Sequence, residues 1–155
     1  MKSRGGFTLV EILIVVVILG ILAAIVVPQF TNASEEAKTS RLMQDLQTVR
    51  SQLELYKIQH TGDLPGSTSA EIITALTGYT DVLGATAVAG APGTFGPYMQ
   101  KMPANPFAFT GNETLIQPVA VAGAAGAGDG STGWAFNLVT GAFTANDDDP
   151  NHVAF

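Results

Sequence analysis

A single acidic side chain stands at the start of the most apolar part of the sequence. Glu11 is followed by sixteen residues, 12–27, that carry no charge. A carboxylate inside an apolar membrane helix is costly, so it normally has a partner or a function. Cleavage of the chain after Gly6 would create a new α-amino group on Phe7, one helical turn from Glu11. An amine and a carboxylate so placed can form an ion pair.

Two arrangements account for the position of Glu11. In the first, the amine of a neighbouring subunit, staggered along an axis, neutralises Glu11 in a low dielectric and favours one axial stagger over others. In the second, the chain is a simple signal anchor, and Glu11 lies at the headgroup boundary, four residues into the apolar run. The position of this carboxylate alone leaves both arrangements open.

The apolar stretch has the length of a membrane span. Residues 7–27 are 21 positions, about 32 Å as a helix, which matches a hydrocarbon core of about 30 Å. Lys2 and Arg4 precede this helix, which predicts a cytoplasmic N-terminus and an exported C-terminal part. A secretory signal would carry its small-residue cleavage site on the far side of a shorter apolar region. Here the Gly-Gly pair comes first, so cleavage would remove only residues 1–6.

The sequence RGGFTLVE at residues 4–11, followed by an Ile/Leu/Val stretch to about Phe30, resembles the N-terminus of type IV pilins and type II secretion pseudopilins. The resemblance implies that a prepilin peptidase cuts between Gly6 and Phe7. It also implies that the same enzyme methylates the new amine to give N-methylphenylalanine. It further implies that Glu11 is needed for efficient assembly of a filament. The simple signal anchor is disfavoured once this resemblance is counted.

Two residues are expected to weaken the long helix. Gly20 disfavours a helix interior by about 1 kcal/mol, and Pro28 removes a backbone hydrogen bond and clashes with the preceding turn. Both stand where the family that the chain resembles carries helix-weakening residues. The segment between them is expected either to lose helical bonds and let a filament lengthen under load, or merely to kink a membrane helix.

Beyond Pro28 the helical pattern becomes amphipathic. Apolar residues recur at spacings of three to five and predict one helix over about 7–59, which Gly62 and Pro65 end. These apolar positions are Phe30, Ala33, Ala37, Leu42, Leu46, Val49, Leu53 and Tyr56. The predicted organisation is a cleaved leader at 1–6, a transmembrane and assembly helix at 7–28, its amphipathic half at 29–60 and a globular head at 61–155.

The head is expected to be α+β, with a small antiparallel sheet packed on the long helix. A short helix is predicted over 69–76, with its cap among residues 67–69. Strands are predicted over 115–121 and from Trp134, with a hairpin turn at Thr140-Gly141. The segments GPYM, PANPF and GWAF resemble the globular part of major pseudopilins more loosely, which implies a pilin-like head.

Three consecutive carboxylates, Asp147, Asp148 and Asp149, lie near the end of the sequence, and Asp129 lies in the preceding glycine-alanine loop. In major pseudopilins, which this chain resembles, a C-terminal loop often binds calcium. Clustered oxygen ligands suit Ca²⁺, so these residues are a candidate calcium site. The alternative is a solvated acidic tail. No other cofactor is expected.

The composition excludes several classes of function. Removal of residues 1–6 leaves five basic and 13 acidic residues, a formal charge of −8, with no basic patch for a phosphate backbone. The chain has no cysteine and therefore no disulfide. His60 and His152 are the only histidines, and neither belongs to a metal-binding spacing or a nucleophile constellation. The sequence therefore predicts neither a nucleic-acid-binding protein nor an enzyme.

The leading prediction is a structural subunit of a type II secretion pseudopilus, which polymerises through its N-terminal helix to support protein export. The expected partners are further copies of the chain in a helical filament, the prepilin peptidase and inner-membrane assembly machinery. The precursor would be a single-pass inner-membrane protein with a periplasmic head, and would then join a periplasmic or surface filament. The alternatives are a type IV pilus subunit for adhesion, motility or DNA uptake, and a membrane-anchored binding module that never polymerises.

Overall fold

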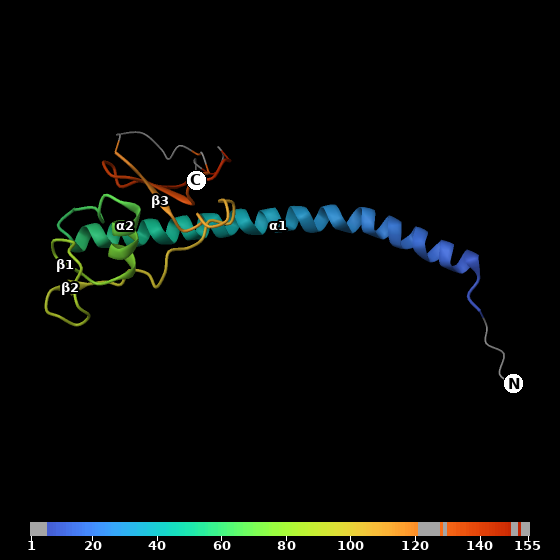
Figure 1. The fold of residues 1–155 in the computed structure, drawn as a ribbon, viewed down its shortest axis with the longest axis horizontal. Coiled ribbons are helices and arrows are strands. Elements are labelled where there is room, and N and C mark those ends of the chain that lie inside the picture. Colours follow the sequence, from blue (N-terminus) through green and yellow to red (C-terminus); the bar gives the residue numbers. More distant parts are fainter. Residues whose placement is uncertain (1–5, 121–127, 129, 150–151, 153–155) are drawn as a thin grey trace. The chain divides into compact units, whose positions relative to one another are not determined.

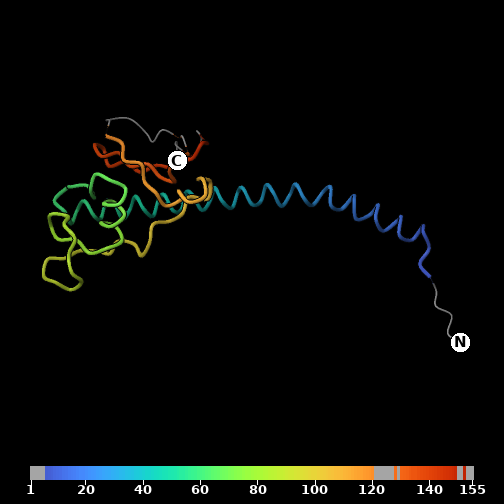
Figure 2. Tube along the Cα trace, viewed as in Figure 1, coloured from blue at the N-terminus to red at the C-terminus, as the bar shows by residue number. Residues whose placement is uncertain are grey.

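The computed structural model describes residues 6–120, 128, 130–149 and 152 (Figures 1 and 2). The chain divides into two compact units, Met1–Thr39 and Ser40–Phe155. The long helix α1, Leu9–Gln59, begins in the first unit and ends in the second. The second unit also contains α2, Ser69–Thr77, and all five strands.

The part of α1 within the second unit buries one stripe of side chains, as its sequence pattern predicts. The buried residues are separated by steps of three and four, which place them on one face of a helix. They are Leu42, Leu46, Val49, Leu53 and Tyr56. The helix ends where expected, because the backbone N–H of Gly62, at a φ of 99°, donates to the carbonyl of Lys57.

Helix α2 is one residue longer than the predicted range and is fixed by a capping box. The hydroxyl of Thr68 accepts from the backbone N–H of Glu71 at 3.3 Å, and Glu71 Oε2 accepts from the backbone N–H of Thr68 at 3.1 Å. Glu71 Oε2 also accepts from the backbone and hydroxyl of Ser67. The cap thus lies within the expected residues 67–69, and it aims Ile72 and Leu76 into the core.

The capping box makes part of the stability of the head dependent on pH. Hydrogen bonds from Ser67, and then from Thr68, lower the pKa of Glu71 from its usual 4.5. A carboxylate with a lowered pKa in the folded state stabilises that state above pH 4.5 and loses this effect as the pH falls through the lowered value. We expect the melting temperature of the Glu71→Gln variant to lie below the wild-type value at pH 7 and to converge with it below pH 4.5. Thermal melts across this range would test the expectation; a constant difference would contradict it.

The head contains two small sheets. In the first, β1, Thr80–Asp81, pairs antiparallel with β2, Thr94–Phe95, in a region where no strand was predicted. In the second, the strand order is β3, Ile116–Val119, then β4, Trp134–Asn137, then β5, Phe143–Ala145. The β4–β5 pair is antiparallel and encloses the predicted turn, in which Gly141 N–H donates to the carbonyl of Asn137 at 2.8 Å.

The pairing of β3 with β4 is parallel, so the expected antiparallel sheet is in fact mixed. The physical reason is the length of the connection. Fourteen residues, 120–133, separate the two strands, and a parallel pair needs a crossover of about a dozen residues or more, whereas a hairpin needs only a short turn.

The core lies where the amphipathic part of α1 meets α2 and the three-stranded sheet. Every residue of β4 is buried, and Trp134 donates through Nε1 to the carbonyl of Pro103 at 2.9 Å. The rings of Trp134 and Phe143 stack with centroids 5.3 Å apart. Leu138 follows the end of β4 and packs partly buried against the core. The α+β, pilin-like arrangement predicted from the sequence is confirmed.

Candidate processing and assembly segment

The proposed cleavage point lies in exposed, non-helical backbone. Gly6 and Phe7 precede the first turn of α1, and the Phe7 side chain is 78% exposed. No heavy atom lies within 4 Å of the position that a Cβ on Gly6 would take. Within the described residues, the bond between Gly6 and Phe7 is therefore open to a protease.

Glu11 forms a capping box with Thr8 at the start of α1. Its Oε2 accepts from the backbone N–H of Thr8 at 2.8 Å and from the Thr8 hydroxyl at 2.7 Å. The backbone N–H of Glu11 donates back to that hydroxyl at 3.3 Å. The box holds the carboxylate at the positive end of the helix, beside the position where cleavage would place the Phe7 amine.

Thr8 is a site residue that the sequence prediction did not include. The signal was present, because Thr-x-x-Glu directly before an apolar run is the sequence form of a capping box. In the single chain, Glu11 therefore has a neutral hydrogen-bonding partner before any neighbour is present.

The segment after Glu11 is apolar on every side. An 18-residue window of α1 has a mean hydropathy of 3.3, and none of it is buried within the described part of the chain. Each large apolar side chain from Ile12 to Val27 is between 41% and 62% exposed. By length and composition this helix can cross a membrane. A helix that is hydrophobic all round requires lipid or other helices around it.

Gly20 and Pro28 both lie inside a helix that continues through them. Pro28 lacks an N–H, so the carbonyl of Ala24 loses its usual helical donor. One turn further, the hydroxyl of Thr31 donates to the carbonyl of Val27 at 3.2 Å, a side-chain contact that often bends helices. The expectation that the segment between Gly20 and Pro28 lengthens under load stays a prediction.

The three C-terminal carboxylates are not brought together. Asp147 is fully buried, Asp148 is exposed, and the side chain of Asp149 is 43% exposed. Across residues 6–120, 128, 130–149 and 152, no three His, Cys, Asp or Glu side chains group so that they could hold a metal ion. Asp129, the fourth candidate ligand, lies outside the described residues.

His60 serves as a core residue of the head. Its ring stacks on Tyr56 with centroids 3.7 Å apart, and its two nitrogens contact the carbonyl of Tyr56 and the hydroxyl of Thr80, both at 2.9 Å. Tyr98 donates to Gln59 at 2.6 Å beside it. Burial raises the pKa of Tyr56 and of Tyr98, so both phenols remain protonated at neutral pH.

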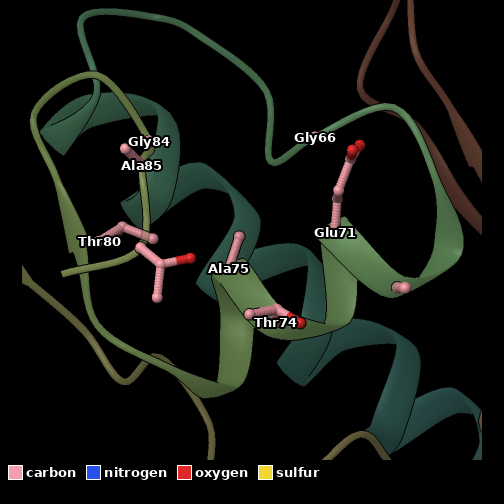
Figure 3. A pocket seen from close by; sticks show the side chains of 9 residues that line it. Gly66, Glu71, Thr74, Ala75, Thr80, Gly84 and Ala85 are labelled. Atoms are coloured by element: carbon pink, nitrogen blue, oxygen red, sulfur yellow. The ribbon is translucent and has the colours of Figure 1, made fainter.

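A hollow of about 420 Å³ lies between α2 and the β1 region. It is lined by small and hydroxyl-bearing residues, among them Thr74, Thr80 and Gly84 (Figure 3). Its one acidic residue, Glu71, accepts three hydrogen bonds from Ser67 and Thr68 through Oε2. The lining itself contains no histidine or cysteine, and the hydroxyl of Thr80 contacts the buried ring of His60.

Comparison with known proteins identifies the N-terminal segment. The family model described as the prokaryotic N-terminal methylation motif matches residues 1–27. The N-terminal region is also similar to proteins named type II secretion system core protein G. That of Pseudomonas aeruginosa is 44% identical over 59 residues, which are 38% of this chain and 42% of the relative.

Two further relatives of the same name give similar values. The protein of Dickeya chrysanthemi is 43% identical over 60 residues, 39% of each chain, and that of Vibrio cholerae is 39% identical over 61 residues, 39% of this chain and 42% of the relative. The chain thus spans less than half the length of the curated relatives it matches. No solved structure matches it. Over its N-terminal region, which holds Gly6, Phe7 and Glu11, the chain therefore carries the prokaryotic N-terminal methylation motif and resembles type II secretion pseudopilins.

Proposed function

We propose that this protein is a structural subunit of a type II secretion pseudopilus and polymerises through α1 to support protein export. The observation that carries the proposal is the exposed apolar surface of α1 from Ile12 to Val27. Such a surface requires lipid around it before assembly and other helices around it afterwards. The similarity to proteins named type II secretion system core protein G supports the choice of secretion among filament functions.

Processing comes first in the proposed mechanism. A prepilin peptidase cuts between Gly6 and Phe7, removes the basic leader and methylates the Phe7 amine. The non-helical, exposed backbone at Gly6 supports this step, since a protease needs an extended substrate. Before extraction, the subunit spans the inner membrane once, with its N-terminus cytoplasmic and its head periplasmic.

Assembly follows when inner-membrane machinery extracts the processed subunit into a helical bundle. Thr8 uses only Oε2 of Glu11, so Oε1 is left for an incoming ammonium group. The amine of a neighbouring Phe7 can then bind Glu11 without first breaking the capping box. Because a charged pair in an apolar bundle is favourable only at close contact, this pair favours one axial stagger of the subunits.

The experiment that tests the processing step is the N-terminal sequence and intact mass of the protein from its native membrane, with and without the prepilin peptidase. We expect a chain that begins at Phe7 and carries one additional methyl group, only when the peptidase is present. A chain that still begins at Met1, or that is cut after Ala24, would overturn the proposal. The former would indicate a simple anchor and the latter a secreted domain.

Deletion of the gene separates secretion from the other filament functions. Loss of protein export without loss of surface filaments is expected for a pseudopilus subunit. Loss of adhesion, motility or DNA uptake with intact export would instead assign the chain to a type IV pilus. Sheared cell material without sedimentable filaments, even when the protein is overproduced, would favour an anchored module that does not polymerise.

A further inference from the structure

The described end of the chain is held by a buried side-chain network. Asp147 is 0% exposed and lies just after β5. Its Oδ2 accepts from Asn105 Nδ2 at 2.9 Å, and its Oδ1 accepts from His152 Nδ1 at 2.9 Å and from the backbone N–H of Asp149 at 3.2 Å. Three N–H groups, from Asn105, His152 and Asp149, therefore donate to one carboxylate.

The partners of Asp147 are themselves fixed. Asn105 is fully buried, donates to the carbonyl of Gly133 at 2.7 Å and accepts from the backbone N–H of Phe107 at 2.9 Å. The ring of Phe107 packs on the ring of His152 with centroids 4.4 Å apart. Because both ends of each hydrogen bond are held by other contacts, little side-chain freedom remains to be lost when the network forms.

This arrangement does not fit the calcium ion that the pseudopilin resemblance implies. Calcium takes six to eight oxygen ligands, and both oxygens of Asp147 already accept hydrogen bonds from nitrogen donors. A cation there would face the N–H groups of Asn105 and His152 rather than lone pairs. The exposed carboxylate of Asp148 has no part in the network, although it would be an obvious ligand in a calcium loop.

We propose that an imidazole takes the role of a metal ion in this protein, so that His152 is held against the residues after β5 by an Asp147–His152 clamp that does not need calcium. His152 donates its Nδ1 proton, because an ionised carboxylate only accepts. This leaves Nε2 facing the carboxylate of Asp149 at 3.7 Å. The clamp ties the chain after β5 to the segment that contains Asn105 and Phe107. This inference concerns the head alone and does not depend on the proposed filament.

The test is the melting temperature of the full chain in detergent micelles, followed by the fluorescence of Trp134, the only tryptophan and a fully buried one. We expect the same midpoint, within about 1 °C, in EDTA and in millimolar CaCl₂. A calcium site filled at about 100 times its Kd would raise the midpoint by roughly 10 °C. A calcium-dependent rise in the wild-type chain would therefore overturn the proposal.

Variants of the clamp give a second readout. His152→Ala leaves the carboxylate of Asp147 buried without its main partner and is expected to lower the midpoint by about 5–10 °C. His152→Asn places an amide N–H near the position of Nδ1 and is expected to recover at least half of that loss. Asp148→Asn is the matched control, with an expected midpoint equal to wild type. A His152→Ala chain that melts at the wild-type temperature would overturn the clamp, as would a lowered midpoint for Asp148→Asn.

Discussion

Replacement of Glu11 by Gln is expected to leave cleavage after Gly6 intact and to reduce filament assembly by at least about tenfold. Gln keeps the size of the side chain and can still accept from Thr8 through its amide oxygen, so the start of α1 is preserved. What is lost is the negative charge. The amine of a neighbouring Phe7 would then enter an apolar bundle without a counter-charge, which disfavours the registered contact. Sedimentable filaments in sheared cell material, with the chain's N-terminus checked by mass, measure both effects.

The matched control is Thr8→Val, which removes the hydroxyl of the capping box but keeps the charge of Glu11 and the backbone N–H that donates to its Oε2. If register is the role of Glu11, Thr8→Val assembles within about twofold of wild type, because the capping contact is worth little beside an ion pair in a bundle. A loss in Thr8→Val as large as that in Glu11→Gln would contradict the register proposal, because the Thr8 hydroxyl would then matter as much as the charge of Glu11. Normal filaments from Glu11→Gln would refute the register proposal.

The helices were predictable because their information is local. The three-and-four spacing from Leu42 to Tyr56 specifies one buried face, and Gly62 ends α1 through a contact five residues back along the chain. The cap of α2 at Thr68 is equally local. The direction of β3 was not predictable in the same way. The direction in which a four-residue strand pairs depends on the path of the connection that follows it. The residue pattern of Ile116–Val119 does not indicate that path.

The candidate sites also differ in whether they depend on local or on long-range contacts. The predicted roles of Gly6, Phe7 and Glu11 rest on a motif of neighbouring residues, which a sequence displays directly. The acidic run near the C-terminus suggested three equivalent oxygen ligands. In the folded chain, however, Asp147 is buried and Asp148 is exposed. Asn105 is 42 residues from Asp147, and no spacing rule relates the two. A cluster of acidic residues in a sequence therefore indicates a metal site only when the backbone directs their carboxylates toward the same position.

Replacement of Gly133 by Ala is expected to be among the most damaging single changes in the head. A Cβ on this residue would run into the backbone of Glu113, at the carbonyl oxygen, the carbonyl carbon and the Cα. Backbone cannot rotate away as a side chain can, so the two segments must separate. Gly133 also donates to Asn112 at 2.8 Å and accepts from Asn105 and from the backbone N–H of Asn146. We expect a loss of about 3 kcal/mol or more in the free energy of unfolding.

The control for Gly133→Ala is Gly90→Ala. Gly90 has a φ of 76°, which strains an alanine by about 1 kcal/mol, but no heavy atom lies within 4 Å of its Cβ position. Denaturant unfolding followed by Trp134, the residue after Gly133, compares the two variants with wild type. Similar losses in both would mean that the loss of a glycine, and not the contact with Glu113, sets the effect. A much larger loss for Gly133→Ala would show that β4 is held in place by this backbone contact, on which the burial of Trp134 and the hydrogen bond from Asn105 both depend.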